Sequence, residues 1–314
     1  MGGEGKPLAF CGQPRDLPKG EPLWPIREDQ RPEVVHTVEA FLEAALFEPH
    51  VDRVVVLPNG IDLLGQHDGV PECVRQALVS SRNMRDFLST LDPLAQESLR
   101  GRLWHYGNFG REKEVKRKGQ RKSIAECVRS GLGEGGQVPA SAPMYVSELR
   151  WMEKVRHPIA QEEMVKTATS RDIYDATPFA RGMPLWERSE GGIFVGERGA
   201  GSGMHVDQCL WSNVGRNWCG HKLFAIWPWT ERHSIVSDVG KGRVFHMPLC
   251  QEDTGFLARA KTIALVGPGD VWVFSGAQPH TALCVGDGLN VTAYESLVPA
   301  HEAAVGTLVR TNTK

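Results

Sequence analysis

The sequence lacks any segment that would place the protein in a membrane. No apolar run among the 314 residues approaches the ~18 residues that a spanning helix needs. The N-terminus, MGGEGKPLAF, has no apolar signal-peptide core, and Lys6 stands where N-myristoylation prefers Ser or Thr. By elimination, we expect a cytoplasmic or nuclear protein with no membrane partner.

Paired cysteines and an excess of one charge are also missing. The seven cysteines are odd in number and show no CxxC or finger-like spacing, which argues against a disulfide framework and a structural zinc site. Reduced intracellular thiols are the simpler interpretation. The formal net charge of −2 gives no general attraction to nucleic acid, so a nucleic-acid partner is only weakly supported. No internal repeat is present, and the oligomeric state is left open.

The N-terminal part reads as a tail followed by a mainly helical region. Residues 1–25 are rich in Gly and Pro and are expected to form a flexible tail, and residues 26–140 form the helical region. Apolar residues at three- and four-residue steps predict a helix from Val34 to Leu46, before Pro49.

Further elements of this region follow from local signals. Residues 52–57 and 61–64 are predicted to be two strands joined by a tight turn at Pro58-Asn59-Gly60. Helices are predicted at about 71–90 and 93–104, the second with Asp92 as its N-cap.

A basic run and a glycine-rich connection come next. Residues 111–122 (REKEVKRKGQRK) carry seven Lys or Arg. Such a run is typical of a nuclear-localisation signal, of a patch for nucleic acid or an acidic partner, or simply of a solvated loop. Residues 131–143 (GLGEGGQVPASAP) resemble a flexible connection, so we place a domain boundary near residue 141.

The C-terminal half is rich in strand signals. Short segments of Val, Ile, Phe and Trp alternate with Gly/Pro turns, which favours a β-sandwich or barrel over a βαβ sheet. We therefore expect an α+β protein with a β-barrel domain at 141–300 and a C-terminal tail at 301–314. The predicted strands are 192–196, 223–227, 262–266, 271–275 and 289–297.

One short motif in this half has the chemistry of a metal site. His205 and Asp207 are two residues apart, so in an extended strand their side chains point to the same face. With the distant His280 they would supply two imidazoles and one carboxylate, a set that leaves three metal positions open and is used by non-haem Fe(II) oxygenases. The motif alone is a weak signal, because His50-Val51-Asp52 repeats it at a helix-to-strand junction.

The surroundings of His205 distinguish it from this second copy. The run Gly199 to Gly203 allows a close backbone approach or a sharp turn. Downstream, Lys222 opens an apolar strand, where its charge would be costly unless it meets a carboxylate. The turn Gly267-Pro268-Gly269-Asp270 then leads into a strand that ends shortly before His280.

These pieces together resemble the Jumonji-C (JmjC) family of Fe(II)- and 2-oxoglutarate-dependent oxygenases, most closely its small hydroxylases. The resemblance covers about residues 144–298, and no part of it extends to the N-terminal half. The matching pieces are Tyr145-Val146, Asp172-Ile173-Tyr174 with Pro178, Ile193 to Gly196, Ser202 to Asp207, Gly220 to Lys222 with Pro228, and Gly267 to His280.

The resemblance implies a double-stranded β-helix (jelly-roll, cupin-like) core and a specific ligand set. His205, Asp207 and His280 would hold Fe(II), whose other positions take 2-oxoglutarate and O2. The distal carboxylate of 2-oxoglutarate would be bound by Lys222, with hydroxyl groups from Ser202 and Tyr145. Asn213 is a further candidate contact, although the segment between Asp207 and Lys222 is two residues longer than in the family. Asn290 and Thr292 are alternatives for a polar residue of the last core strand.

The expected reaction is hydroxylation of a protein or peptide side chain with release of succinate and CO2. Three alternatives stay open: a JmjC histone lysine demethylase that releases formaldehyde, a cupin metalloenzyme that does not use 2-oxoglutarate, and a non-catalytic cupin-like binding protein. Hydroxylation is favoured because the sequence has no Cys/His zinc module of the kind that accompanies many histone demethylases. Substrate identity is not readable from these residues.

Overall fold

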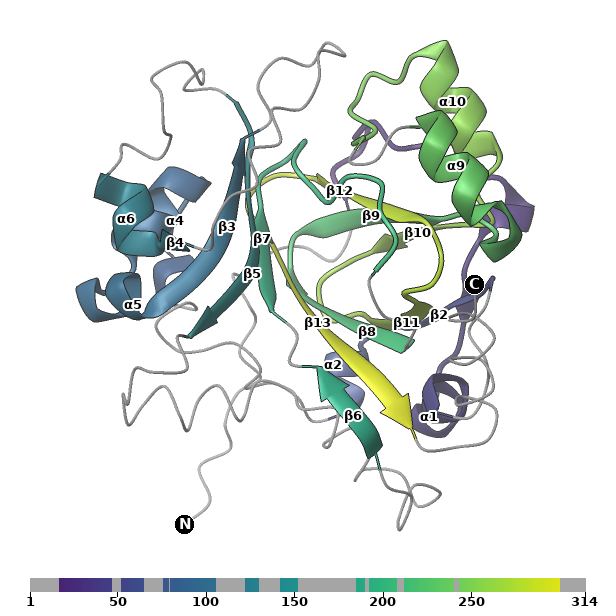
Figure 1. Cartoon of the computed structure of the whole chain (residues 1–314), viewed down its shortest axis with the longest axis horizontal. Coiled ribbons are helices and arrows are strands. Elements are labelled where there is room, and N and C mark those ends of the chain that lie inside the picture. The colour runs from purple at the N-terminus through teal and green to yellow at the C-terminus, as the bar shows by residue number, and fades with distance from the viewer. Residues whose placement is uncertain are drawn as a thin grey trace.

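The computed structural model describes residues 17–46, 52–64, 76–78, 80–105, 122–129, 142–151, 185–189, 192–207, 212–239 and 243–299. Within these ranges the protein is a mixed α+β structure with one large sheet, a smaller three-stranded sheet, and short helices at the sides (Figure 1). No described helix has both the length and the apolar character that crossing a membrane requires.

Ten strands of the described chain form the large sheet, which is antiparallel except for its first pair. The order is β1-β2-β11-β8-β13-β7-β5-β3-β4, and β6 also pairs with β13. The bounds are β1 Glu33–Val34, β2 Val54–Leu57, β3 Leu99–His105, β4 Lys122–Ser123, β5 Met144–Trp151, β6 Leu185–Ser189, β7 Ile193–Gly196, β8 Ser212–Cys219, β11 Val271–Ser275 and β13 Asn290–Pro299.

The smaller sheet has the order β10-β9-β12 and lies against the large one. Its strands are β9 His221–Ile226, β10 Thr262–Val266 and β12 His280–Val285, all antiparallel. Trp272 and Phe274 of β11 lie 6.5 and 4.5 Å from the ring of Phe224 on β9, measured between ring centroids. Since strand side chains alternate faces, each sheet turns one face toward this shared interior.

The opposite face of the large sheet packs against the helices of the N-terminal region. Val271 and Val273 of β11 belong to one buried cluster with Phe41 and Phe87 of the helices. The described helices of the N-terminal region are η2 Glu28–Gln30, α1 Val38–Leu46, α2 Gly60–Leu63, α4 Met84–Thr90, α5 Pro93–Ser98 and α6 Ile124–Arg129. Those of the C-terminal half are η3 Trp229–Glu231, α9 Arg232–Val239 and α10 Gln251–Ala258. The N-terminal region therefore adds four strands as well as helices, and it shares a core with the C-terminal half.

Three predicted helices have other bounds in the structure. The helix predicted at about 71–90 is interrupted before Asn83, which caps α4 Met84–Thr90. The first helix begins at Val38, because the hydroxyl of Thr37 accepts a hydrogen bond from the Ala40 amide as an N-cap, and the preceding Glu33–Val34 pairs with β2. The helix after Asp92 has the predicted cap but ends at Ser98, and Leu99–His105 is strand β3. The alternation of Arg100 and Arg102 with Leu99 and Leu103 favours a strand there.

The predicted strand at 61–64 is also wrong, since Gly60–Leu63 is the short helix α2. Strand β2 already pairs with β1 on one side and β11 on the other, so no ladder is left for a hairpin partner. Gly60 packs closely on β11, where an added Cβ would lie 2.7 Å from the Val271 Cβ. The strands predicted at 262–266 and 271–275 are confirmed, and those at 192–196, 223–227 and 289–297 are confirmed within a few residues.

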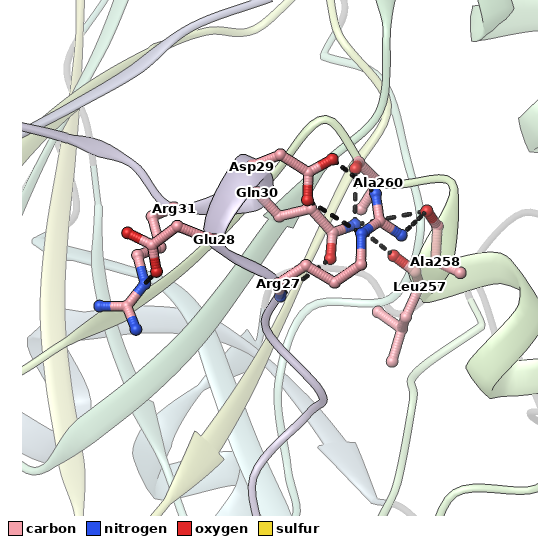
Figure 2. A network of polar contacts seen from close by, with 8 residues as sticks. All are labelled: Arg27, Glu28, Asp29, Gln30, Arg31, Leu257, Ala258 and Ala260. Atoms are coloured by element: carbon pink, nitrogen blue, oxygen red, sulfur yellow. Dashed lines mark hydrogen bonds and ion pairs between the residues drawn. The ribbon is translucent and has the colours of Figure 1, made fainter.

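The described part of the expected N-terminal tail is packed against the small sheet rather than free. Trp24 is buried, and its indole N–H donates to the carbonyl of Phe245 at 3.0 Å. Gln30 is also buried, and its side-chain amide donates to the carbonyls of Leu257 (2.9 Å), in the last turn of α10, and Ala260 (2.8 Å), just after it (Figure 2). The segment thus adds side-chain donors to carbonyls at the C-terminal end of the helix.

Replacing Gln30 with methionine is expected to lower the free energy of unfolding by about 2 kcal/mol, because the buried carbonyl of Ala260 would lose its side-chain donor. The Leu257 carbonyl would keep the backbone amide of Ala260. Urea unfolding of the two proteins measures this difference. Arg27→Met is the matched control, because Arg27 contacts the same helix end from an exposed position and its loss should change stability little. Equal effects of the two substitutions would contradict the role given to Gln30.

Candidate metal centre

The segment from Gly199 to Asp207 runs beside strand β12 and brings the distant histidines together. His205 and His280 exchange both backbone hydrogen bonds, at 3.1 and 2.9 Å, and form an isolated antiparallel bridge. The glycine-rich run makes this possible, because a Cβ on Gly201 would lie 2.0 Å from the Ala282 carbonyl oxygen. Backbone pairing therefore fixes the position of His205 relative to β12.

The two imidazoles and the carboxylate meet as the sequence predicts. His205 Nε2 lies 3.4 Å from Asp207 Oδ1, and His280 Nε2 lies 3.9 Å from Asp207 Oδ2. One ligand atom from each of the three residues lies within 4.8 Å of the others, so the group can hold a metal ion. His280 is buried, whereas His205 and Asp207 are half-buried, which makes one side of the group accessible to solvent.

Both imidazoles are oriented by backbone carbonyls. Nδ1 of His205 lies 2.7 Å from the carbonyl oxygen of Gly203, and Nδ1 of His280 lies 2.8 Å from that of Gln278. A carbonyl oxygen can only accept, so each Nδ1 carries the proton and each Nε2 presents its lone pair to the centre of the group. This arrangement is typical of metal-binding histidines.

The charges of the group also suit a cation. Burial alone would raise the pKa of Asp207, but the nearby imidazoles of His280 and His205 and the amide of Asn213 lower it to about 2. Burial, together with the neighbouring His205, lowers the pKa of His280 to about 4. At neutral pH the site therefore presents a carboxylate and a neutral imidazole, the protonation states that metal ligation requires.

Asn213 lies on the opposite wall and contacts the metal-binding carboxylate directly. Its side-chain amide donates to Asp207 Oδ2 at 2.5 Å. The residue comes from β8, where it pairs with Phe274 of β11. This contact orients a candidate ligand, a role that differs from the co-substrate contact expected from the sequence.

We expect Asn213→Ala to weaken metal affinity by about 10- to 100-fold, because the Asp207 carboxylate loses the donor that orients it. Titration with Mn(II) followed by calorimetry measures the change. Asn83→Ala, which removes an asparagine cap from helix α4, serves as the control and should leave the affinity unchanged. An equal loss in both variants would indicate a general effect of destabilisation.

Lys222 points into the interior between the two sheets. It pairs with Cys284 in the register of β9 and β12, and Cys284 shares a face with His280 because four residues separate them. Lys222 is fully buried, and its Nζ has no hydrogen-bond partner among the described residues. Burial lowers the pKa of Lys222 to about 8, a shift that the neighbouring Cys284 opposes. A buried ammonium without a partner is costly and fits an anionic ligand.

The other expected co-substrate residues divide into two groups. Tyr145 and Ser202 meet, with their hydroxyl oxygens 3.1 Å apart. Asn290 and Thr292 instead hydrogen-bond to Oδ1 of Asn217, at 2.8 and 3.0 Å, so each has a partner within the interior. The structure therefore gives no reason to choose one of these two as a ligand contact.

The second HVD motif has a structural role as far as it is described. Asp52 Oδ1 accepts hydrogen bonds from the Trp229 amide (2.7 Å) and from the Gln278 side chain (2.9 Å). His50 lies outside the described residues, as do residues 111–121, 131–141, 172–174 and 301–314. Elsewhere, His221 is buried, His246 is half-buried and His233 is exposed.

Comparison with known proteins adds no relative: no family model matches the chain, and no curated protein matches it. The geometry itself gives two chemical properties, a group of three ligands that can bind a cation and a buried, uncompensated ammonium that can bind an anion. Of the two tyrosines whose rings lie beside this ammonium, sequence reasoning named Tyr145 but missed Tyr294. The alternation of β13 places Tyr294 on the face of Asn290 and Thr292 and was the available signal.

Proposed function

We propose that this protein is an Fe(II)- and 2-oxoglutarate-dependent oxygenase of the JmjC type that hydroxylates a protein side chain. The observation that carries the proposal is the pairing of two features in one interior. The group of two histidines and one carboxylate lies at the start of β12, where His205 pairs with His280. The Lys222 ammonium, which has no hydrogen-bond partner among the described residues, faces the same interior. On this proposal the two sheets are the walls of a double-stranded β-helix.

The donor set fits this metal and this co-substrate. His205, Asp207 and His280 would hold Fe(II), and their three ligand atoms would leave positions for 2-oxoglutarate and O2. Lys222 would bind the distal carboxylate, and the Tyr145 and Ser202 hydroxyl groups would add donors beside it. When bound, iron and 2-oxoglutarate supply the oxidising power, and decarboxylation yields succinate and CO2.

The chain's own residues would position the reactants and keep water out. The aromatic rings of Phe224 and Phe274 lie 5.7 and 5.1 Å from the His280 imidazole, so the inner side of the site is apolar. The half-buried His205 and Asp207 mark the side from which a substrate side chain would approach. Asn213 would keep the Asp207 carboxylate in its orientation throughout.

The test uses the full-length protein with Fe(II) in the absence of oxygen. Addition of 2-oxoglutarate is expected to produce the weak visible charge-transfer band of the chelated metal, and admission of O2 should then release succinate. The His205→Ala variant is expected to show neither signal. Iron binding without the band would favour a metalloenzyme that does not use 2-oxoglutarate, and the absence of iron binding would favour a non-catalytic protein; either result overturns the proposal.

A further inference from the structure

The Lys222 ammonium is surrounded by aromatic rings instead of acids. Its Nζ lies 5.7 Å from the centre of the Tyr145 ring and 5.4 Å from the centre of the Tyr294 ring. Both distances are within the ~6 Å over which a ring face attracts a cation. These rings come from β5 and β13 of the large sheet, whereas Lys222 belongs to the small one.

No acidic or titratable group among the described residues forms a hydrogen bond with the Lys222 ammonium. Both carboxylate oxygens of Glu197 accept hydrogen bonds from backbone amides, those of Met84 and Met144, each at 2.7 Å. Burial raises the pKa of the Cys284 thiol to about 11, so this neighbour is neutral at physiological pH.

The two phenols that face Lys222 are neutral as well. Burial raises the pKa of both Tyr145 and Tyr294. Asp207 is turned toward the imidazoles of His205 and His280. Among the described residues, the ammonium is therefore stabilised by its attraction to the two tyrosine rings.

We propose that the rings of Tyr145 and Tyr294 hold the Lys222 ammonium between them, and that Tyr294 is thereby a positioning residue for the anion that binds at Lys222. Ring faces attract the charge without occupying its N–H groups. A carboxylate partner would neutralise the charge and compete with an incoming anion. These two rings, which we call the clamp, therefore keep the ammonium in place and leave its N–H donors for the ligand.

Packing fixes the orientation of Tyr294. Its ring meets Phe194 and Trp272 edge to face, with centroids 5.1 and 5.6 Å away. Tyr145 is fixed by its hydroxyl contact with Ser202. Because neighbouring rings hold Tyr294 in place, the face it presents to Lys222 does not depend on its own hydroxyl group. Phenylalanine at position 294 should therefore preserve the clamp.

The inference rests on the proposed function for the identity of the anion, a dicarboxylate such as 2-oxoglutarate, but the clamp itself is testable without it. In metal-free protein carrying 15N-labelled lysine side chains, the pKa of Lys222 can be followed by NMR. Tyr294→Phe is expected to leave this pKa unchanged, while Tyr294→Leu should lower it by about one unit, since a desolvated cation–π contact is worth ~1–2 kcal/mol.

Phenylalanine analogues with increasing fluorine content at position 294 provide a second series that preserves the shape of the ring. Fluorine withdraws charge from the ring face, so the Lys222 pKa should fall stepwise along the series. This series keeps the test decisive if Tyr294→Leu does not fold. A Lys222 pKa that is unchanged along the series would overturn the clamp.

Binding measurements then separate the clamp from the proposed function. With Mn(II) present, calorimetry should show 2-oxoglutarate binding about tenfold weaker to Tyr294→Leu than to Tyr294→Phe. If the pKa shifts occur but even the unmodified protein does not bind 2-oxoglutarate, the clamp stands and the oxygenase proposal fails. If 2-oxoglutarate binds both variants equally well, Tyr294 is not a positioning residue.

Discussion

Replacing Lys222 with methionine is expected to stabilise the protein at neutral pH and to weaken binding of 2-oxoglutarate strongly. The lysine is fully buried, with no hydrogen-bond partner among the described residues, and burial lowers its pKa to about 8. Methionine fills a similar volume without a charge. The variant should therefore be more stable by about 3 kcal/mol at pH 7, the free energy that corresponds to the difference between this pKa and the ordinary value.

The pH dependence of stability identifies this charge as the cause. Between pH 8 and about 10.5 the folded protein loses the Lys222 proton while the unfolded chain keeps it, so the unfolded state binds more protons. The free energy of unfolding should consequently rise with pH across this window in the natural protein. The methionine variant should lack this contribution, and the difference between the two proteins should shrink toward zero above pH 10.5.

Urea unfolding at pH 7 and pH 10 and calorimetry with 2-oxoglutarate measure the two effects. Loss of a charge-assisted contact to a carboxylate should weaken binding on the order of 100-fold. A methionine variant that is less stable at pH 7 would mean that the contacts of Lys222 in the free protein outweigh the cost of burying its charge. A variant that binds 2-oxoglutarate normally would exclude Lys222 from the anion site.

Replacing Asp207 with alanine should remove the stabilisation of the protein by a divalent metal. A metal that binds only the folded state raises the free energy of unfolding by about 2.7 kcal/mol at 100 times its dissociation constant. Without Asp207 the group has two imidazoles and no negative charge, so the same metal concentration should give little change in Tm. Thermal unfolding with and without Mn(II) measures the difference, and succinate release should disappear in parallel.

The second HVD motif supplies the matched control. Asp52→Ala removes an acceptor for two hydrogen bonds and should lower Tm, yet the rise in Tm with Mn(II) should remain. A metal-dependent rise that survives in Asp207→Ala, or disappears in Asp52→Ala, would assign the metal to a different place in the molecule.

Local signals in the sequence determined much of the C-terminal half. Strands such as Thr262–Val266 and Val271–Ser275 were predictable because apolar and β-branched residues lie between Gly/Pro turns. Gly269 adopts a φ of +90°, which a turn glycine tolerates without strain. The same-face placement of His205 and Asp207 follows from a spacing of two along an extended chain.

Prediction of helix or strand from the sequence failed where the choice depended on which segments pair in the sheet. Gly60–Leu63 follows an apparent hairpin turn, but the two edges of β2 are taken by β1 and β11, segments from different parts of the chain. Leu99–His105 continues a helix-like run, yet it pairs with β5. The local sequence of a segment carries no information about whether the edge of a neighbouring strand is already paired with another strand.

The sequence by itself determined which residue types are available for a metal and where two of them share a face. Only the tertiary structure brought His280 to them, through backbone pairing with His205 across 75 residues, and turned Asn213 toward Asp207. It also surrounded Lys222 with two tyrosine rings and no acid. The physical reason is that these contacts depend on strand register between distant segments, which the whole core fixes and no short stretch encodes.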